Sequence, residues 1–255
     1  MISSATNPKI KYVRKLQADK RFRIQQQVFV IEGSRWFSEL MGQIEKPKAV
    51  YFTERWQETS AQAAILHKTD APTQLVAENV MRTMSDTHSP PGILAVLPMV
   101  KRPFPTPLTS LLILDGITTP GNMGTMLRTA AAAGINAILL TDGCVDPYNP
   151  KVVRGSMGAL LRLPVQQASW ADIAKLTASL QVFIASAQET KAYTAVNWKR
   201  PFALIIGNEA NGPSQAAWEI ASSGIAIPMH TETESLNAAI AASIILFEAK
   251  RQNDK

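Results

Sequence analysis

The most informative stretch for the fold lies near the end of the chain. It reads Ile225-Ala226-Ile227-Pro228-Met229-His230-Thr231-Glu232-Thr233-Glu234-Ser235-Leu236-Asn237 and continues into residues 238–250. A short apolar run ended by a proline, then a polar loop, then apolar residues at helical spacing predict a buried strand, an exposed loop and a buried helix. Ser235 stands where the helix is expected to begin, and serine is a favoured N-cap because its hydroxyl accepts a hydrogen bond from an otherwise unpaired amide. The stretch is therefore either a capped core helix or, in its polar loop, one wall of a functional site.

The composition indicates a cytoplasmic protein without a membrane segment. The 255 residues are 46% hydrophobic, which is enough for one large or two modest domains. The sole cysteine, Cys144, excludes an intrachain disulfide and fits a reducing compartment. Residues 1–15 are polar and cationic, unlike a secretory signal, and the apolar run 238–247 is too short to cross a bilayer.

The net charge of +6 is concentrated at the N-terminus. Residues 1–50 hold ten Lys or Arg against four Asp or Glu, whereas residues 51–255 hold sixteen of each. A helix is predicted to start after Pro8, with Ile10, Val13 and Leu16 on its apolar side. Such a basic surface is either a nucleic-acid or lipid contact or a solvated helix face. The candidate phosphate-binding cations are Lys9, Lys11, Arg14, Lys15, Arg21 and Arg23.

Two domains are expected. Strands at 28–31, 49–52 and 92–96 alternate with helices at Ser34–Leu40 and around 61–66, so residues 1–97 form a small α/β domain. Four prolines between Pro98 and Pro107 indicate an extended linker over 98–108. The second domain, residues 109–255, begins with a buried strand at 111–115.

The start of the second domain is a near miss to a nucleotide-binding fingerprint. Its first strand is followed by a glycine-containing loop, a helix over about 122–133 that ends at Gly134, a strand at 137–141, and Asp142. The G-x-G-x-x-G pattern is absent and the loop holds a proline, so a nicotinamide oxidoreductase is only an alternative. Residues 143–164 are interpreted as a long connection in which Arg154 is a candidate phosphate ligand.

Three polar loops follow short apolar strands in this second domain. They lie at 122–128, around Glu209, and at 235–237. If the strands are parallel neighbours, their carboxyl ends meet and the loops form one pocket, where ligands bind in open α/β sheets.

At this point a family resemblance becomes visible. The patterns Asn122-x-Gly124-x-x-x-Arg128, Gly207-Asn208-Glu209-Ala210-Asn211-Gly212, and Ile227-Pro228-Met229 with Ser235-Leu236-Asn237 resemble the three ordered motifs of the SpoU, or TrmH-type, RNA ribose methyltransferases of the SPOUT superfamily. Asn7-Pro8-Lys9-Ile10-Lys11 and Phe29-Val30-Ile31-Glu32-Gly33 resemble that family's substrate-binding domain, which is related to kink-turn-binding ribosomal proteins. Residues 150–158 resemble its intermotif segment.

The resemblance implies an α/β fold with a parallel sheet and a deep trefoil knot, a homodimer, and S-adenosylmethionine as cofactor. It implies transfer of a methyl group to a ribose 2′-hydroxyl, of ribosomal RNA before transfer RNA, with no metal. The implied cofactor-binding residues are Gly207, Ile227, Met229 and Leu236; the implied catalytic residues are Arg128, Asn122, Glu209, Ser235 and Asn237. Asn122 is expected to orient Arg128 or the ribose, Glu209 to fix Arg128 or substrate, and the last two residues to order the pocket.

Two features of the implied site stay open. A guanidinium is a poor base because it remains protonated in proteins, so Arg128 is expected to bind a neighbouring phosphate that assists deprotonation. Thr119 stands where the family often has Asp.

Three alternatives to a ribosomal RNA methyltransferase remain. They are a non-catalytic RNA-binding or ribosome-assembly factor, a transfer RNA substrate, and a membrane-surface role for the basic helix.

Overall fold

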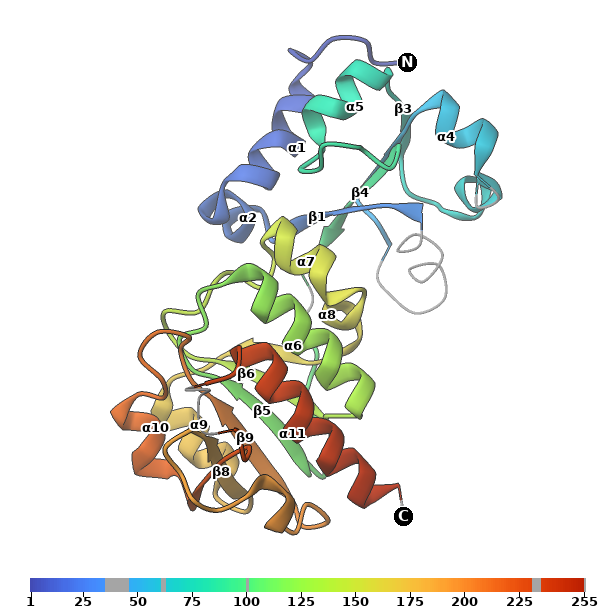
Figure 1. Ribbon diagram of the computed structural model, residues 1–255. Coiled ribbons are helices and arrows are strands. Elements are labelled where there is room, and N and C mark those ends of the chain that lie inside the picture. Colours follow the sequence, from blue (N-terminus) through green and yellow to red (C-terminus); the bar gives the residue numbers. More distant parts are fainter. Residues whose placement is uncertain (35–45, 61–62, 100, 231–234, 255) are drawn as a thin grey trace. The chain divides into compact units, whose positions relative to one another are not determined.

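The structure is a computed structural model that describes residues 1–34, 46–60, 63–99, 101–230 and 235–254 (Figure 1). The helix expected over Ser34–Leu40 lies, apart from its first residue, outside the described residues. The chain forms two compact units, Met1–Val100 with Tyr148–Arg154, and Lys101–Pro147 with Gly155–Lys255. No helix in these described ranges is both long and apolar enough to cross a bilayer.

The N-terminal unit is built on a four-stranded sheet in the order β1-β4-β2-β3. Strands β1 and β2 both pair antiparallel with β4, and β2 pairs parallel with β3. The elements are β1 (Val28–Glu32), β2 (Ala49–Phe52), β3 (Thr73–Leu75), β4 (Ile93–Pro98), α1 (Pro8–Ala18), α2 (Lys20–Gln26), α4 (Glu54–Thr59), the 3₁₀ helix η1 (Ala63–Lys68) and α5 (Glu78–Met84). The predicted strands at 28–31, 49–52 and 92–96 are confirmed within two residues.

Helix α1 forms as its sequence predicts. Pro8 is its first residue, where no amide hydrogen is needed, and the Asn7 side chain caps it by accepting a hydrogen bond from the Lys9 amide. Ile10, Val13 and Leu16 are fully buried in a core shared with β1, β4 and α5. The apolar side of α1 is therefore buried in the core of its own unit.

The second unit is built on a six-stranded sheet in the order β10-β8-β9-β5-β6-β7, in which every pair is parallel. Its strands are β5 (Ser110–Leu114), β6 (Ala137–Leu140), β7 (Val165–Gln167), β8 (Gln181–Ala185), β9 (Phe202–Ile206) and β10 (Ser223–Ile225). The central strands β5 and β9 are buried at every position, as apolar strands of a two-sided parallel sheet are. The expected adjacency holds for β5 and β9, whereas β8 separates β9 from β10.

Helices cover both faces of this sheet. They are α6 (Pro120–Ala133), α9 (Trp170–Thr177), α10 (Gln215–Ile220) and α11 (Ala238–Asn253). The unit also contains α8 (Ala159–Arg162) and the 3₁₀ helix η2 (Tyr193–Ala195), whereas α7 (Pro150–Ser156) belongs for the most part to the first unit. Leu111 and Ile113 of β5 pack with Ile173 of α9 and Ala217 of α10. Helices α6 and α11 lie side by side (Figure 1). Gly134 ends α6 in the left-handed conformation, at φ 80°, as predicted.

The interpretation of residues 143–164 as a connection is wrong, because this stretch contains α7 and α8. Pro150 opens α7, and left-handed Gly158 separates it from α8. A Cβ on Gly155 would lie only 3.3 Å from the Cα of Gly124. The glycine at position 155 therefore permits a close approach to the backbone of α6.

The predicted start of the last helix is also wrong. Helix α11 begins at Ala238, and its N-cap is Asn237, whose Oδ1 accepts hydrogen bonds from the amides of Ala239 (2.9 Å) and Ile240 (3.3 Å). Ser235 lies two residues outside the helix. The helical spacing is visible in the sequence, but Ser235 and Asn237 are both capping-competent and lie two positions apart, so the sequence leaves the first residue of the helix open.

Candidate functional site

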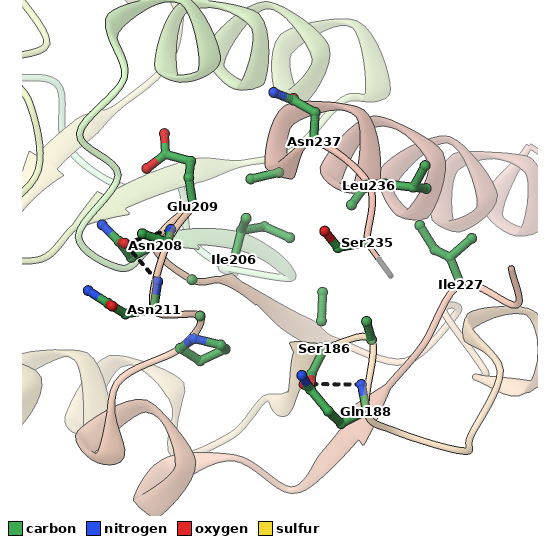
Figure 2. Close-up of a pocket in the computed structure, with 18 of the residues that line it drawn as sticks. Ser186, Gln188, Ile206, Asn208, Glu209, Asn211, Ile227, Ser235, Leu236 and Asn237 are labelled. Carbon is green, nitrogen blue, oxygen red and sulfur yellow. Dashed lines mark hydrogen bonds between the residues drawn. The ribbon is translucent and has the colours of Figure 1, made fainter. Parts of the chain in front are cut away.

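A cavity of about 820 Å³ opens at the carboxyl edge of the sheet in the second unit (Figure 2). Its walls are the segments that leave β8, β9 and β10, together with Thr119 and Asn122 at the start of α6 and the first turns of α11. The three polar loops that the sequence singled out therefore do meet in one pocket. Its volume lies in the range of small-molecule sites.

The carboxylate of Glu209 joins the loop after β9 to the start of α6. Its Oε1 accepts hydrogen bonds from the Thr119 amide (3.2 Å) and from Asn122 Nδ2 (3.0 Å). Its Oε2 accepts from the amide and the hydroxyl of Thr118, both at 3.3 Å. A carboxylate at the first turn of a helix also interacts favourably with the helix dipole. One side chain thus fixes two of the three loops relative to each other.

These contacts keep Glu209 ionised. Partial burial is the largest single influence and raises the pKa of the carboxyl, but hydrogen bonds from Asn122 and from the amides of Glu209 itself, Thr118 and Thr119 together outweigh it. The pKa falls from the ordinary 4.5 to about 2. Glu209 is therefore a hydrogen-bond acceptor at neutral pH and not a proton donor.

Asn122 carries the connection on to the third loop. Its Oδ1 accepts a hydrogen bond from Asn237 Nδ2 at 3.0 Å, while its Nδ2 donates to Glu209. Asn237 at the same time caps α11. Although Asn122 and Asn237 are 115 residues apart in sequence, the side chains of Glu209, Asn122 and Asn237 form one continuous hydrogen-bonded chain across the pocket mouth.

The loop after β9 is held by its own sequence. Asn208 Nδ2 donates to the carbonyl of Gly116 (2.6 Å), and its Oδ1 accepts from the amides of Ala210 and Asn211. A Cβ on Gly207 would lie 2.2 Å from the nitrogen of Pro213, so only glycine fits where the loop folds back. The Asn208 side chain thus fixes the loop, both to itself and to the segment after β5.

The structure brings together eight of the expected site residues. The residues that line the cavity are Asn122, Gly207, Glu209, Ile227, Met229, Ser235, Leu236 and Asn237. Arg128 is exposed on α6 and is not part of the described lining. Its assignment as a catalytic residue stays a prediction.

The expected phosphate-binding cations of the N-terminal unit have different environments. Lys9, Lys11, Arg14, Lys15 and Arg21 are exposed. Arg23 is only 3% exposed, and its Nη1 donates to the carbonyls of Leu16 (2.7 Å) and Gln17 (3.0 Å). The expectation that Arg23 contacts phosphate is wrong in this structure, because its guanidinium satisfies carbonyls at the end of α1. Arg154 pairs with Asp86 at 2.8 Å.

Several lining residues were missed from the sequence. Ser186 and Gln188 follow β8, Asn211 lies in the loop after β9, and Trp218 lies on α10 (Figure 2 labels the first three). A signal was present for the first two, since they come directly after the short apolar run 182–185, just as the other lining segments follow apolar runs. This signal could not be used, because the sequence does not show that β8 lies between β9 and β10 and therefore beside the pocket.

The lining suits a small organic ligand better than a metal or an anion. Among the described lining residues Glu209 alone is charged; the others are apolar, such as Ile227 and Leu236, or small or amide-bearing. No group of three or more His, Cys, Asp or Glu that could hold a metal ion occurs in the described ranges. The fold and the pocket together define the class: an α/β protein with a cofactor-sized pocket at the carboxyl edge of a parallel sheet, and a separate basic unit.

Comparison with known proteins identifies the family. Residues 109–247 match the model of the SpoU rRNA Methylase family, and residues 7–95 match the MRM3-like substrate binding domain. The chain belongs to the SpoU rRNA methylase family.

Relatives and solved structures agree with this assignment. An uncharacterised tRNA/rRNA methyltransferase of Synechocystis is 37% identical over 98% of this chain and 93% of its own length. The 23S rRNA (guanosine(2553)-2′-O)-methyltransferase RlmP of Bacillus subtilis is 31% identical over 98% of both chains. The AdoMet-bound rRNA methyltransferase of Sinorhizobium meliloti is 28% identical, with a TM-score of 0.86, over 98% of this chain and 97% of that one.

The capping assignment leads to a stability prediction. Asn237→Ala removes two hydrogen bonds to orphan amides of α11 and the link to Asn122, so we expect a loss of about 1 kcal/mol in the free energy of unfolding. Ser235→Ala, two residues away, is the matched control and should change it by less than about 0.5 kcal/mol. Urea unfolding of both variants measures the difference; a larger loss for Ser235→Ala would restore it as the cap.

The low pKa of Glu209 leads to a pH prediction. Because the folded-state pKa is depressed to about 2 from 4.5, the carboxylate contributes stability that is complete above pH 4.5 and is lost as the pH falls towards 2. The difference in denaturant midpoint between the wild type and Glu209→Gln should therefore be constant near neutrality and shrink across that window. A difference that does not change with pH there would show that the charge of Glu209 is not what holds the loops.

Proposed function

We propose that this protein transfers a methyl group from S-adenosylmethionine to a ribose 2′-hydroxyl of ribosomal RNA. The observation that carries the proposal is the hydrogen-bonded chain Glu209–Asn122–Asn237, which joins the three family motifs around one cofactor-sized pocket. The ribosomal substrate rests on the matched family and on the printed activity of the Bacillus subtilis relative. The AdoMet-bound structural neighbour supports the cofactor.

The pocket fits the proposed cofactor. Ile227, Met229 and Leu236 supply apolar walls, and the backbone around Gly207 supplies a surface free of bulky side chains. When bound, S-adenosylmethionine supplies an activated methyl group on a sulfonium. Glu209, the charged residue of the described lining, adds a negative field that suits a cationic ligand and would oppose an anionic one.

The protein's own residues have separable roles in this proposal. Glu209 and Asn122 hold the start of α6, and Asn237 holds the start of α11, so that the pocket walls keep a fixed distance. Positioning of this kind contributes to catalysis by aligning the reacting atoms. Arg128 remains protonated and binds a substrate phosphate, which assists removal of the proton from the ribose oxygen.

We further propose that the second unit forms a homodimer through α11. Ile240 and Phe247 on this helix are 52% and 48% exposed, and residues seven apart lie on one stripe of a helix. Large apolar side chains that share one exposed stripe are typical of an interaction surface. By the family resemblance, we also propose that the second unit contains a trefoil knot and that the protein acts in the cytoplasm. We propose the domain bounds 1–97 for the substrate-binding domain, 98–108 for the linker and 109–255 for the methyltransferase domain. The substrate-binding domain is, by the same resemblance, related to kink-turn-binding ribosomal proteins.

Methyl transfer tests the proposed function. With tritiated S-adenosylmethionine and deproteinised ribosomal RNA, the wild type should label the RNA, and Arg128→Ala should lower the rate on the order of 10²-fold or more. Cofactor affinity of this variant by calorimetry should stay unchanged, because Arg128 lies outside the described lining. Arg128→Lys keeps the charge and should retain part of the rate.

The alternatives give different results in the same assay. Labelling of transfer RNA in place of ribosomal RNA would change the substrate. Cofactor uptake, or RNA binding, without transfer to either RNA would favour a non-catalytic factor and contradict the proposal.

Sedimentation tests the homodimer. Phe247→Asp places a charge on the exposed stripe of α11 and should convert a dimer to monomers. Ile24→Asp is the matched control, because Ile24 is 50% exposed on α2 of the other unit. If the wild type sediments as a monomer, or if both variants behave alike, α11 is not the interface.

A further inference from the structure

A second recess lies in the N-terminal unit, between α1 and the end of α5. It has a volume of about 370 Å³ and is lined by Lys11, Arg14, Lys15, Gln17 and Ala18 of α1 and by residues 83–86. We call it the α1 groove. Three cations from one helix face the same recess, which a merely solvated helix surface does not require.

The three cations occupy one stripe of α1. Lys11, Arg14 and Lys15 stand at positions i, i+3 and i+4, so their side chains are neighbours on the helix surface. Lys9 and Arg21 are exposed but are not part of the described lining. The groove therefore selects three of the seven cations that the sequence marked as phosphate ligands.

The positive charge of the groove is not neutralised by its own wall. Asp86, its one acidic lining residue in the described part of the chain, is paired with Arg154 at 2.8 Å. Lys15 Nζ lies 4.3 Å from the centre of the Phe22 ring. Lys11 and Arg14 have no side-chain hydrogen-bond or ion-pair partner among the described residues, so both can bind an anion without first breaking such a bond.

The wall opposite the cations is held in place by a buried glutamate. Glu32 is 8% exposed; its Oε1 accepts from Gln17 Nε2 (2.6 Å) and from the Asp86 amide (2.9 Å), and its Oε2 accepts from the Ser85 hydroxyl. This acid is thereby committed to bracing α1 against the loop after α5. The groove is a formed recess and not a flat charged surface.

The cations weaken the helix that carries them. Helix α1 contains no acidic residue, its Lys11 and Lys15 are like charges at i and i+4, and Lys9 and Lys11 lie in its first turn, at the positive end of the helix dipole. A local arrangement that opposes stability without a compensating interaction is typical of a functional surface.

We propose that the α1 groove binds the phosphodiester backbone of the RNA substrate, with Arg14 and Lys11 as the phosphate ligands and Lys15 beside them. The inference rests on the proposed function and assigns the site at which the first unit holds its substrate. Arg and Lys are the side chains that bind phosphate, Arg through a two-pronged contact.

An anionic membrane is the other source of phosphate, and the structure favours RNA over it. A helix that lies in a membrane surface needs a free apolar face. In α1 that face consists of Ile10, Val13 and Leu16, each with no exposed surface. The groove thus offers phosphate ligands without a membrane-inserting side.

Three charge variants of the whole chain test the site. Binding of a short fluorescein-labelled RNA is measured by anisotropy at several salt concentrations. We expect Arg14→Ala and Lys11→Glu each to weaken binding about tenfold and to lower the slope of log affinity against log salt by about 0.7 for each phosphate that the variant no longer binds. Arg55 is an exposed cation on α4 outside the groove, so Arg55→Glu is the charge-matched control for Lys11→Glu and should change neither quantity comparably.

A stability readout separates loss of a ligand from loss of fold. Lys11→Glu places an acid four residues before Lys15 and in the first turn of α1, so it should raise the Tm slightly while it weakens RNA binding. A general folding defect would lower both.

The outcomes divide cleanly. A loss for Arg55→Glu as large as that for Lys11→Glu, or unchanged salt slopes, would show that binding follows net charge and would overturn the groove while methyl transfer by the wild type still stood. Binding of vesicles of phosphatidylserine and phosphatidylcholine that the groove variants abolish, with RNA binding unchanged, would overturn it in favour of a membrane. A wild type that neither binds nor methylates RNA would remove the proposed function itself.

Discussion

The second unit depends on one ionised side chain that is shared by loops far apart in sequence. Glu209 takes four hydrogen bonds from the start of α6, and through Asn122 and Asn237 it reaches the N-terminus of α11. Charge-assisted hydrogen bonds are stronger than neutral ones, and a neutral carboxylic acid could not accept all four equally well. The distance between the pocket walls is therefore set by a charge, and that charge is kept by the contacts it makes.

This interaction is possible because every strand of the sheet runs the same way. In a parallel sheet the carboxyl ends of the strands share one edge, so the segments after β8, β9 and β10 converge without any helix having to bend. The helix N-termini also point to that edge, and their orphan amides need acceptors. Asn237 accepts hydrogen bonds from two amides of α11, and Glu209 accepts hydrogen bonds from two amides just before α6. The side chains that satisfy the helix N-termini therefore also shape the pocket.

Much of this arrangement could be predicted from the sequence, and the errors have physical causes. Apolar strands, the Gly134 stop and the loops around Asn122 and Glu209 follow from local patterns that the structure repeats. Ser235 was assigned as the cap because hydrophobic spacing does not fix the first turn of a helix, which Asn237 decides through two amide contacts. Ser186 and Gln188 were missed because strand order is set by long-range packing, of which a strand's own sequence carries no trace.

The basic residues show the same limit most clearly. Arg23 and Arg14 are one residue type nine positions apart, in one cationic run, yet Arg23 is buried against the carbonyls of Leu16 and Gln17 while Arg14 lines an open recess. The difference arises because α1 ends at Ala18 and its last carbonyls lack intrahelical partners, so the cation that follows the turn is drawn onto them. Composition counts both as charge available to a partner. Only the position of the helix end shows that one stabilises the fold while the other lines the recess.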